Sequence, residues 1–246
     1  MVLRPRLGLC SVLAVVMRMR QSRARAFGAG RISAWTLQGM KMLLMTIGGN
    51  MKSQLTQEAV NQLFLEAHTF NKFTDRPVED ETIRRIYDLL KWGPTAVNCQ
   101  PARYVFVKSR EGKARLVPAL NPGNVAKVEA APATVIVAFD LRFFEHLASQ
   151  WTAYDAAAPF AGNAPLAQTA AFRNGSLQGA YLIMAARALG LDCGPMSGFD
   201  NARVDAEFFP EGRFKSNFLI NLGYGADNGY YPRGPRLAFD DAAAII

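Results

Sequence analysis

The sequence predicts an α+β domain, because stretches with strand character and stretches with helical character both occur along it. Residues 133–139 form an unbroken apolar stretch, so we expect a central strand that is buried on both faces. Residues 218–224 indicate a second buried strand, and residues 103–108 also read as a strand. In other parts of the chain, apolar residues recur with the spacing of a helix.

Helices are expected over the ranges 53–67, 80–90, 111–120, 124–130 and 166–189. The second has the clearest signals, with an acidic first turn, apolar residues one turn apart and Gly93-Pro94 at its end. The last is apolar nearly all round, as expected of a helix through a core or an interface. Its Gly175 and Gly179 would allow close packing against another helix, although two tolerated glycines explain the pattern equally well. The tail, residues 228–246, ends in an apolar stretch that needs something to pack on.

The positive charge of the chain is confined to its first fifth. The 246 residues include 28 basic and 20 acidic side chains, a formal net charge of +8. Residues 1–50 contain eight basic and no acidic side chains, so residues 51–246 are neutral overall. The basic composition is therefore no sign of a nucleic-acid surface on the folded domain, and we expect no nucleic-acid partner.

We interpret residues 1–50 as a disordered basic extension and residues 51–246 as a single domain. A start codon assigned too early explains the extension best, with Met45 or Met51 as the true start. A transit-type targeting peptide comes second, because the segment is rich in Arg and free of acidic residues. A secretory signal is a weaker explanation, since a run of Arg separates the apolar stretch from the possible cleavage site.

Several chemistries are disfavoured by the motifs that the sequence lacks. HExxH, CxxC and paired Cys/His clusters are absent, so we expect no metal site, and the absence of GxSxG weakens a hydrolase interpretation. The three cysteines, Cys10, Cys99 and Cys193, lack disulfide spacing, which indicates a reducing compartment, and we expect the cytoplasm. No segment is long and apolar enough to span a membrane.

Residues 223–229, GYGADNG, follow a strand and superficially suggest a dinucleotide-binding loop. Such a loop opens a helix, and an acidic residue follows further on. Here Tyr230-Tyr231-Pro232 follows, which does not begin a helix. We therefore favour an ordinary turn.

Five segments, in order, resemble the FMN-dependent nitroreductase-like oxidoreductases, and the resemblance covers nearly all of residues 55–246. They are residues 73–83, 92–106 (WGPTAVNCQPARYVF), 124–127, 190–200 and 232–237. More narrowly, the chain resembles the branch that contains the malonic semialdehyde reductase of uracil breakdown. That closer resemblance rests on residues 91–95, 98–99, 101–103, 171–174 and 194–200.

The resemblance implies a mixed, mainly antiparallel sheet flanked by helices, in an intertwined homodimer with two FMN sites at its interface. It implies ping-pong chemistry, in which NAD(P)H gives hydride to flavin N5 and malonic semialdehyde then takes it to become 3-hydroxypropionate. A nitroreductase or quinone reductase of broad acceptor range is the first alternative. A non-catalytic FMN-binding protein and a cofactor-free interaction protein are alternatives from other classes.

The turn within residues 92–106 suits a flavin on physical grounds. Small residues let the backbone approach a flat ring closely, and an Asn can donate to and accept from ribityl hydroxyls or the ring edge. The candidates are Pro94, Thr95, Ala96 and Asn98. An ordinary turn from helix to strand explains these residues equally well when they are considered alone.

Two further groups of residues are assigned by the resemblance. Asn124 and Lys127 lie one helical turn apart and would approach the pyrimidine edge of the ring, where a cation stabilises the negative charge of the reduced flavin. The segment Pro195, Met196, Ser197 and Gly198 would direct a backbone N–H at N5, although the family usually has Glu at the position of Ser197. We therefore expect Lys127, Ser197 and Gly198 to be catalytic. A solvated lysine and a plain turn are the alternatives.

The expected phosphate site departs from the family pattern. Arg233 and Arg236 are the candidate cations, unless they belong to a solvated tail. Most of the family carries Arg-Ser-x-Arg near the start of the domain, where this chain has His68, Thr69, Phe70 and Asn71. Lys72 is a possible replacement for the lost charge. For the substrate carboxylate, we expect Arg103 or Arg173.

Overall fold

The structure is a computed structural model that describes residues 53–246, of which Leu55–Ile246 form one compact unit. The expectations for residues 1–50 lie outside the described residues. None of the helices in the described part of the chain has the length and apolar character needed to cross a membrane. Cys99 and Cys193 are both buried and free.

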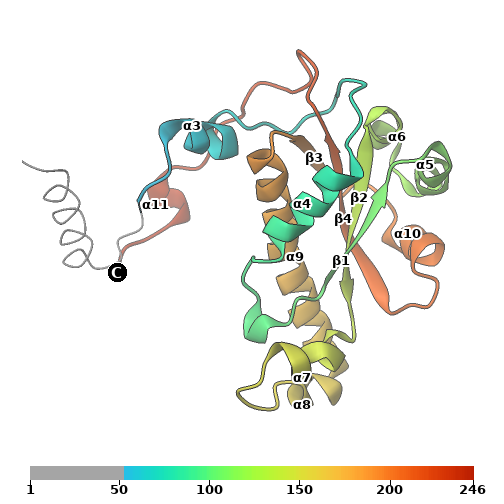
Figure 1. The fold of residues 1–246 in the computed structure, drawn as a ribbon, viewed down its shortest axis with the longest axis vertical. Coiled ribbons are helices and arrows are strands. Elements are labelled where there is room, and N and C mark those ends of the chain that lie inside the picture. Colours follow the sequence, from blue (N-terminus) through green and yellow to red (C-terminus); the bar gives the residue numbers. More distant parts are fainter. Residues whose placement is uncertain (1–52) are drawn as a thin grey trace, which may run out of the picture. The chain divides into compact units, whose positions relative to one another are not determined.

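A four-stranded sheet forms the centre of the domain, with the order β1-β2-β4-β3 (Figure 1). Each neighbouring pair is antiparallel, and the strands are β1 (Ala102–Val107), β2 (Ala133–Asp140), β3 (Asp192–Met196) and β4 (Phe214–Gly223). Within residues 53–246, parallel pairing is limited to one isolated bridge, between Thr69 and Cys193. The predicted α+β class is confirmed, and the mainly antiparallel sheet is antiparallel in all its ladders.

The three predicted strands are present, whereas β3 is an addition. Its sequence, DCGPM, contains Gly and Pro, which are both uncommon in strands. Pro195 has no N–H to donate. It is tolerated because β3 lies at the edge of the sheet, with no further strand of that sheet on its outer side. The loop after β4 contains turns and isolated bridges rather than a helix start, as predicted.

Helices cover both faces of the sheet (Figure 1). The longer ones are α4 (Asp80–Leu90), α5 (Arg110–Leu116), α6 (Pro122–Ala130), α9 (Ala164–Ala188) and α10 (Asn201–Phe208). The short α-helices are α3 (Gln57–Val60), α7 (Leu147–Gln150), α8 (Ala158–Ala161) and α11 (Phe239–Ala242). The 3-10 helices are η2 (Ala96–Asn98), η3 (Val117–Ala119) and η4 (Phe143–His146).

The first expected helix, 53–67, differs from its prediction. It begins only at Gln57, and its second half is a π-helix, η1 (Asn61–Leu65). The predicted helix 111–120 is also divided, because α5 ends at Leu116 and the 3-10 helix η3 begins at Val117, with Pro118 in its first turn. Helix α10 was not expected; its N-cap is Asp200, whose side chain accepts a hydrogen bond from the Arg203 N–H.

Strand β2 separates two apolar layers, because its successive side chains point to opposite faces. Val135 and Val137 pack with α4 and α9 on one side, and Ile136 and Ala138 pack with α5, α6 and α10 on the other. All eight residues of β2 are buried, which explains why this strand has no polar alternation.

The two glycines of α9 allow close packing against the sheet rather than against another helix. A Cβ on Gly175 would lie 3.2 Å from the Cβ of Phe139, and a Cβ on Gly179 would overlap the ring of Phe218. Both contacts are made with side chains of strands. The suggestion of a helix-to-helix contact at these glycines is therefore wrong within the described chain.

We expect Gly194→Ala to lower the free energy of unfolding by about 1–3 kcal/mol, as overpacking typically does. A Cβ at Gly194 would overlap the backbone carbonyl oxygen of Phe70, which cannot move aside as the end of a side chain can. Urea denaturation measures the change. The matched control is Gly123→Ala in α6, where a Cβ meets nothing within 4 Å. Equal stability of the Gly194 variant and the wild type would contradict this close approach.

Candidate functional site

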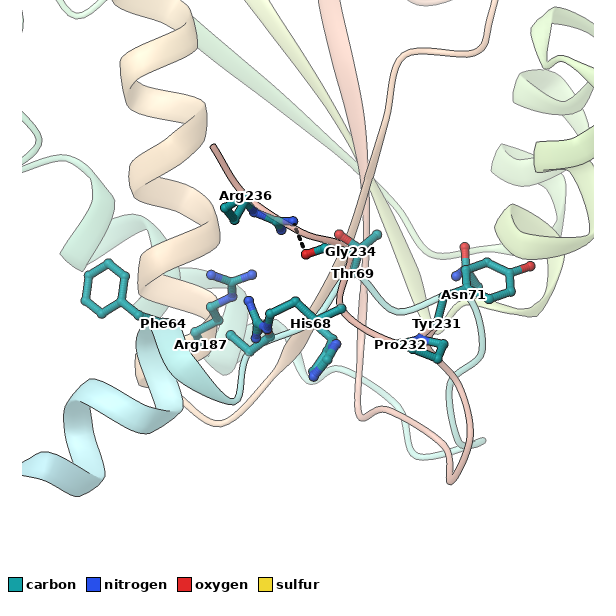
Figure 2. A pocket seen from close by; sticks show the side chains of 11 residues that line it. Phe64, His68, Thr69, Asn71, Arg187, Tyr231, Pro232, Gly234 and Arg236 are labelled. Carbon is teal, nitrogen blue, oxygen red and sulfur yellow. Dashed lines mark hydrogen bonds between the residues drawn. The ribbon is translucent and has the colours of Figure 1, made fainter. Parts of the chain in front are cut away.

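A cavity of about 460 Å³ opens where residues 64–71, the last turn of α9 and the tail come together (Figure 2). Its lining residues are Phe64, Ala67, His68, Thr69, Asn71, Arg187, Tyr231, Pro232, Arg233, Gly234 and Arg236.

Three arginines give this cavity its charge. Arg187, Arg233 and Arg236 line it, and none of the lining residues is acidic. Figure 2 shows Arg187, from the end of α9, and Arg236, from the tail, among the side chains that line the cavity. A guanidinium presents a planar fork of N–H donors that matches the geometry of phosphate and carboxylate. The cavity therefore suits an anion.

Hydrogen bonds to backbone carbonyls hold two of these arginines in place. Arg233 Nη2 donates to the oxygens of Leu65 and Ala67, at 2.7 and 2.8 Å, and so connects the tail to the start of the domain. Arg187 Nη1 donates to the Leu63 oxygen of η1 at 3.0 Å. These bonds join three distant parts of the sequence at the cavity: residues 63–67, the end of α9 and the tail.

The predicted N-terminal part of the phosphate site lies in the same cavity. His68, Thr69 and Asn71 line it together with the two predicted arginines of the tail. Thr69 forms a bridge with Cys193 of β3, and the Asn71 N–H donates to the Gly229 oxygen at 2.6 Å. The five residues that we expected around a phosphate therefore come together in the structure.

Arg187 is a lining residue that sequence reasoning missed. A basic residue in the last turn of a helix is ordinary, because it interacts favourably with the helix dipole, and nothing local marks it as part of a site. Lys72, which we considered as a replacement cation, is exposed and does not line the cavity.

A second group of predicted residues lies beside the end of β3. Asn124 Nδ2 donates to the Gly198 oxygen at 2.9 Å, and Lys127 Nζ lies 3.5 Å from Asn124 Oδ1. Asn124 and Lys127 thus share one face of α6, as their spacing predicts. A Cβ at Gly198 would lie 2.7 Å from Asn124 Nδ2, so a larger residue here would displace the Asn124 side chain. Ser197 is exposed beside them.

Strand β3 connects the cavity to this second group. Cys193 pairs with Thr69 at the cavity, and Ser197 follows the strand directly. At about 3.3 Å per residue, the four steps between them span about 13 Å. Pro195 and Met196 lie between the two groups. An elongated ligand with an anionic end would match this arrangement.

The third group of predicted residues, in the turn between α4 and β1, has an unusual backbone. Val97, Asn98 and Gln100 have φ values of 47°, 53° and 38°. A β-branched residue such as Val is strained at positive φ. The turn is held from inside by Thr95, whose Oγ1 accepts from the Gln100 N–H at 3.2 Å, and Asn98 Nδ2 donates to the Gln150 oxygen.

This turn is far from the arginine cavity within one chain. The Ala96 N–H donates to Asn174 Oδ1, at 2.9 Å, and Asn174 lies near the middle of α9. Arg187 lies 13 residues later on the same helix. At 1.5 Å per residue that separation is about 20 Å. The predicted residues Pro94, Thr95, Ala96 and Asn98 are therefore not brought to the cavity by their own chain.

Arg103, one of the two candidate substrate residues, makes a structural ion pair. Its Nη2 lies 2.7 Å from Oδ2 of the fully buried Asp140, which also receives two hydrogen bonds from Arg213. Burial by itself raises the pKa of the Asp140 carboxyl, but hydrogen bonds from Arg213 and the Arg142 N–H, with the nearby guanidinium charges, lower it overall. Arg103 thus compensates a buried charge.

Arg173, the other candidate, lies on the exposed side of α9. It lines an open, mostly apolar hollow of about 680 Å³ with Thr169, Phe172, Ser176, Leu177 and Ala180. Neither candidate arginine lies in the cavity with Arg187.

Comparisons with known proteins place the chain in a family. Residues 66–224 match the model of the nitroreductase family. A relative from Burkholderia lata is 59% identical over 191 residues, which cover 78% of this chain and 98% of the relative. One from Rhodopseudomonas palustris is 55% identical over 196 residues, 80% of this chain and the whole relative. Both have the provisional name NADH dehydrogenase/NAD(P)H nitroreductase.

Solved structures confirm the fold. A provisionally named nitroreductase from Bacillus subtilis has a TM-score of 0.70 and 21% identity, over 78% of this chain and all of that one. Another, from Exiguobacterium sibiricum in complex with FMN, has a TM-score of 0.66 and 21% identity, over 80% of this chain and all of that one. The predicted family is confirmed: the chain belongs to the nitroreductase family.

Proposed function

We propose that the chain is an FMN-dependent NAD(P)H oxidoreductase. The observation that carries the proposal is the arginine cavity, which β3 connects to the Asn124, Lys127 and Gly198 group. Family membership supports the assignment, as do the names of the relatives and the FMN complex of one structural neighbour. A set of three guanidiniums without a carboxylate fits a cofactor that ends in a phosphate.

The residues present suit each part of that cofactor. Arg187, Arg233 and Arg236 would hold the phosphate, with Thr69 and Asn71 as hydrogen-bonding neighbours. Lys127 would place a cation beside the ring, and its contact with Asn124 orients both side chains on one face of α6. When bound, FMN supplies hydride transfer between NAD(P)H and an acceptor. The protein contributes binding, orientation and electrostatics.

We also propose that a second copy of the chain completes the site. The turn at 94–98 has a strained backbone suited to a ligand, yet lies about 20 Å along α9 from the cavity. The exposed side of α9 carries Phe172, Leu177 and Tyr181, and the tail ends in exposed apolar residues. Several exposed apolar side chains on one side of a helix are typical of an interaction surface.

The purified chain should therefore sediment at twice its monomer mass. Leu177→Asp should shift it toward the monomer, because it places a charge in the centre of the exposed apolar side of α9. Arg110→Asp, on the exposed surface of α5, is the matched control and should leave the mass unchanged. A wild-type chain that stays monomeric at micromolar concentration would contradict the shared site.

The purified chain should be yellow and should bleach when NAD(P)H is added without oxygen. The visible absorption spectrum of the full-length chain measures this, and the same spectrum from residues 51–246 tests whether that domain is sufficient. A yellow protein that does not bleach would favour the non-catalytic FMN-binding alternative. A protein that stays colourless with added FMN would refute the proposal and favour the cofactor-free alternative.

For the acceptor, we propose malonic semialdehyde, which is reduced to 3-hydroxypropionate. Propanal has the same aldehyde without the carboxylate, so the ratio of kcat/KM for the two isolates the contribution of the charge. One charged hydrogen bond contributes about 1.5–3 kcal/mol, which predicts a preference of about 10–100-fold. Arg173→Gln should reduce that preference. A higher kcat/KM with uncharged quinones or nitroaromatics would refute this assignment and favour broad acceptor range.

A further inference from the structure

Arg187 differs from the other two arginines of the cavity in what holds it. Arg233 and Arg236 belong to the exposed tail, whereas Arg187 is half-buried in the last turn of the 25-residue helix α9. A side chain on a long, packed helix is placed more accurately than one on a loop. Its backbone position is set by α9 and its packing, and not by the tail.

A reciprocal pair of hydrogen bonds joins Arg187 to the π-helix η1. Gln62 Nε2 donates to the Arg187 oxygen at 2.6 Å, and Arg187 Nη1 donates to the Leu63 oxygen at 3.0 Å. A π-helix is rare and often marks a functional site. The bond to Leu63 uses one of the five N–H donors of the Arg187 guanidinium. Within residues 53–246 the other donors have no partner, so they are available to a ligand.

The charge of the cavity requires a partner. Three guanidiniums line one space, and the described lining residues include no carboxylate to offset their mutual repulsion. A phosphate monoester carries about −1.5 to −2 charges at pH 7 and three acceptor oxygens. A phosphate would neutralise most of the positive charge of the three guanidiniums, and its oxygens would accept hydrogen bonds from their N–H groups.

We propose that Arg187 binds the phosphate of FMN in place of cations at positions 68 and 71, where this chain has His and Asn, so that it makes the protein select FMN over riboflavin. The inference rests on the proposed function. It explains how a chain with His68 and Asn71 at the start of the domain retains a charged phosphate site. The charge is supplied from the end of α9, more than a hundred residues away in the sequence.

The test compares the affinities of two flavins that differ in the phosphate alone. Quenching of flavin fluorescence gives Kd for FMN and for riboflavin with the full-length wild type and with Arg187→Gln. We expect the variant to bind FMN about 10–100-fold more weakly and riboflavin with less than about threefold change. Added NaCl should weaken FMN binding more in the wild type than in the variant. Arg187→Lys keeps the charge without the fork and should give an intermediate FMN affinity.

Two control variants separate phosphate binding from a structural role. Gln62→Ala removes the hydrogen bond from Gln62 to the Arg187 backbone oxygen but leaves the Arg187 guanidinium. This variant should keep the preference for FMN. Arg203→Gln removes an arginine that also donates to a backbone carbonyl, that of Pro118 at 3.0 Å, but lies outside the cavity. It should change neither affinity.

Several outcomes would overturn the inference. One is an equal loss of FMN and riboflavin affinity in Arg187→Gln, and another is the same loss of FMN preference in Gln62→Ala. A wild type that binds riboflavin as tightly as FMN would overturn the role of Arg187 while leaving flavin binding intact. A wild type that binds neither flavin would overturn the proposed function as well. If FMN binds but NAD(P)H does not bleach it, the catalytic proposal fails and the ratio of the two affinities still decides the role of Arg187.

Discussion

Both halves of the candidate site depend on the packing of helix α9 against the sheet. Asn174 and Gln178 are buried on the side of α9 that faces the sheet, and their side-chain oxygens accept from the backbone N–H groups of Ala96 and Ala102. Leaving the buried N–H of Ala102 without a partner would cost about 1–3 kcal/mol. The same helix that holds the turn before β1 also carries Arg187 at its end. Its packing therefore positions the turn and the cavity together.

The turn at 94–100 stores conformational strain that the surrounding structure maintains. Each non-glycine residue in a sparsely populated backbone conformation costs about 1–3 kcal/mol, and three such residues lie between Val97 and Gln100. The bonds from Asn174 and Thr95 hold the backbone in this conformation. Backbone strain of this kind is typical of functional sites.

The arginines of this protein differ in whether a carboxylate compensates their charge. Arg103 and Arg213 bond to the buried carboxylate of Asp140, so their charges are compensated within the fold. Arg187, Arg233 and Arg236 bond to neutral backbone carbonyls and share a cavity without an acid. A compensated charge stabilises the fold, whereas an uncompensated cluster favours binding of an anion.

Local pattern in the sequence determined the α+β class, three of the four strands and four of the five longer helices, because helical and extended backbones impose their own periodicity on apolar residues. Motif order indicated the family, which the comparisons then confirmed. It also named five of the residues that line the cavity. The tertiary structure alone decided that β3 pairs at the sheet edge and that the glycines of α9 pack on strands. It also decided that Arg103 pairs with Asp140 while Arg187 enters the cavity. These are contacts between residues far apart in the chain, and they arise from packing that no local pattern encodes.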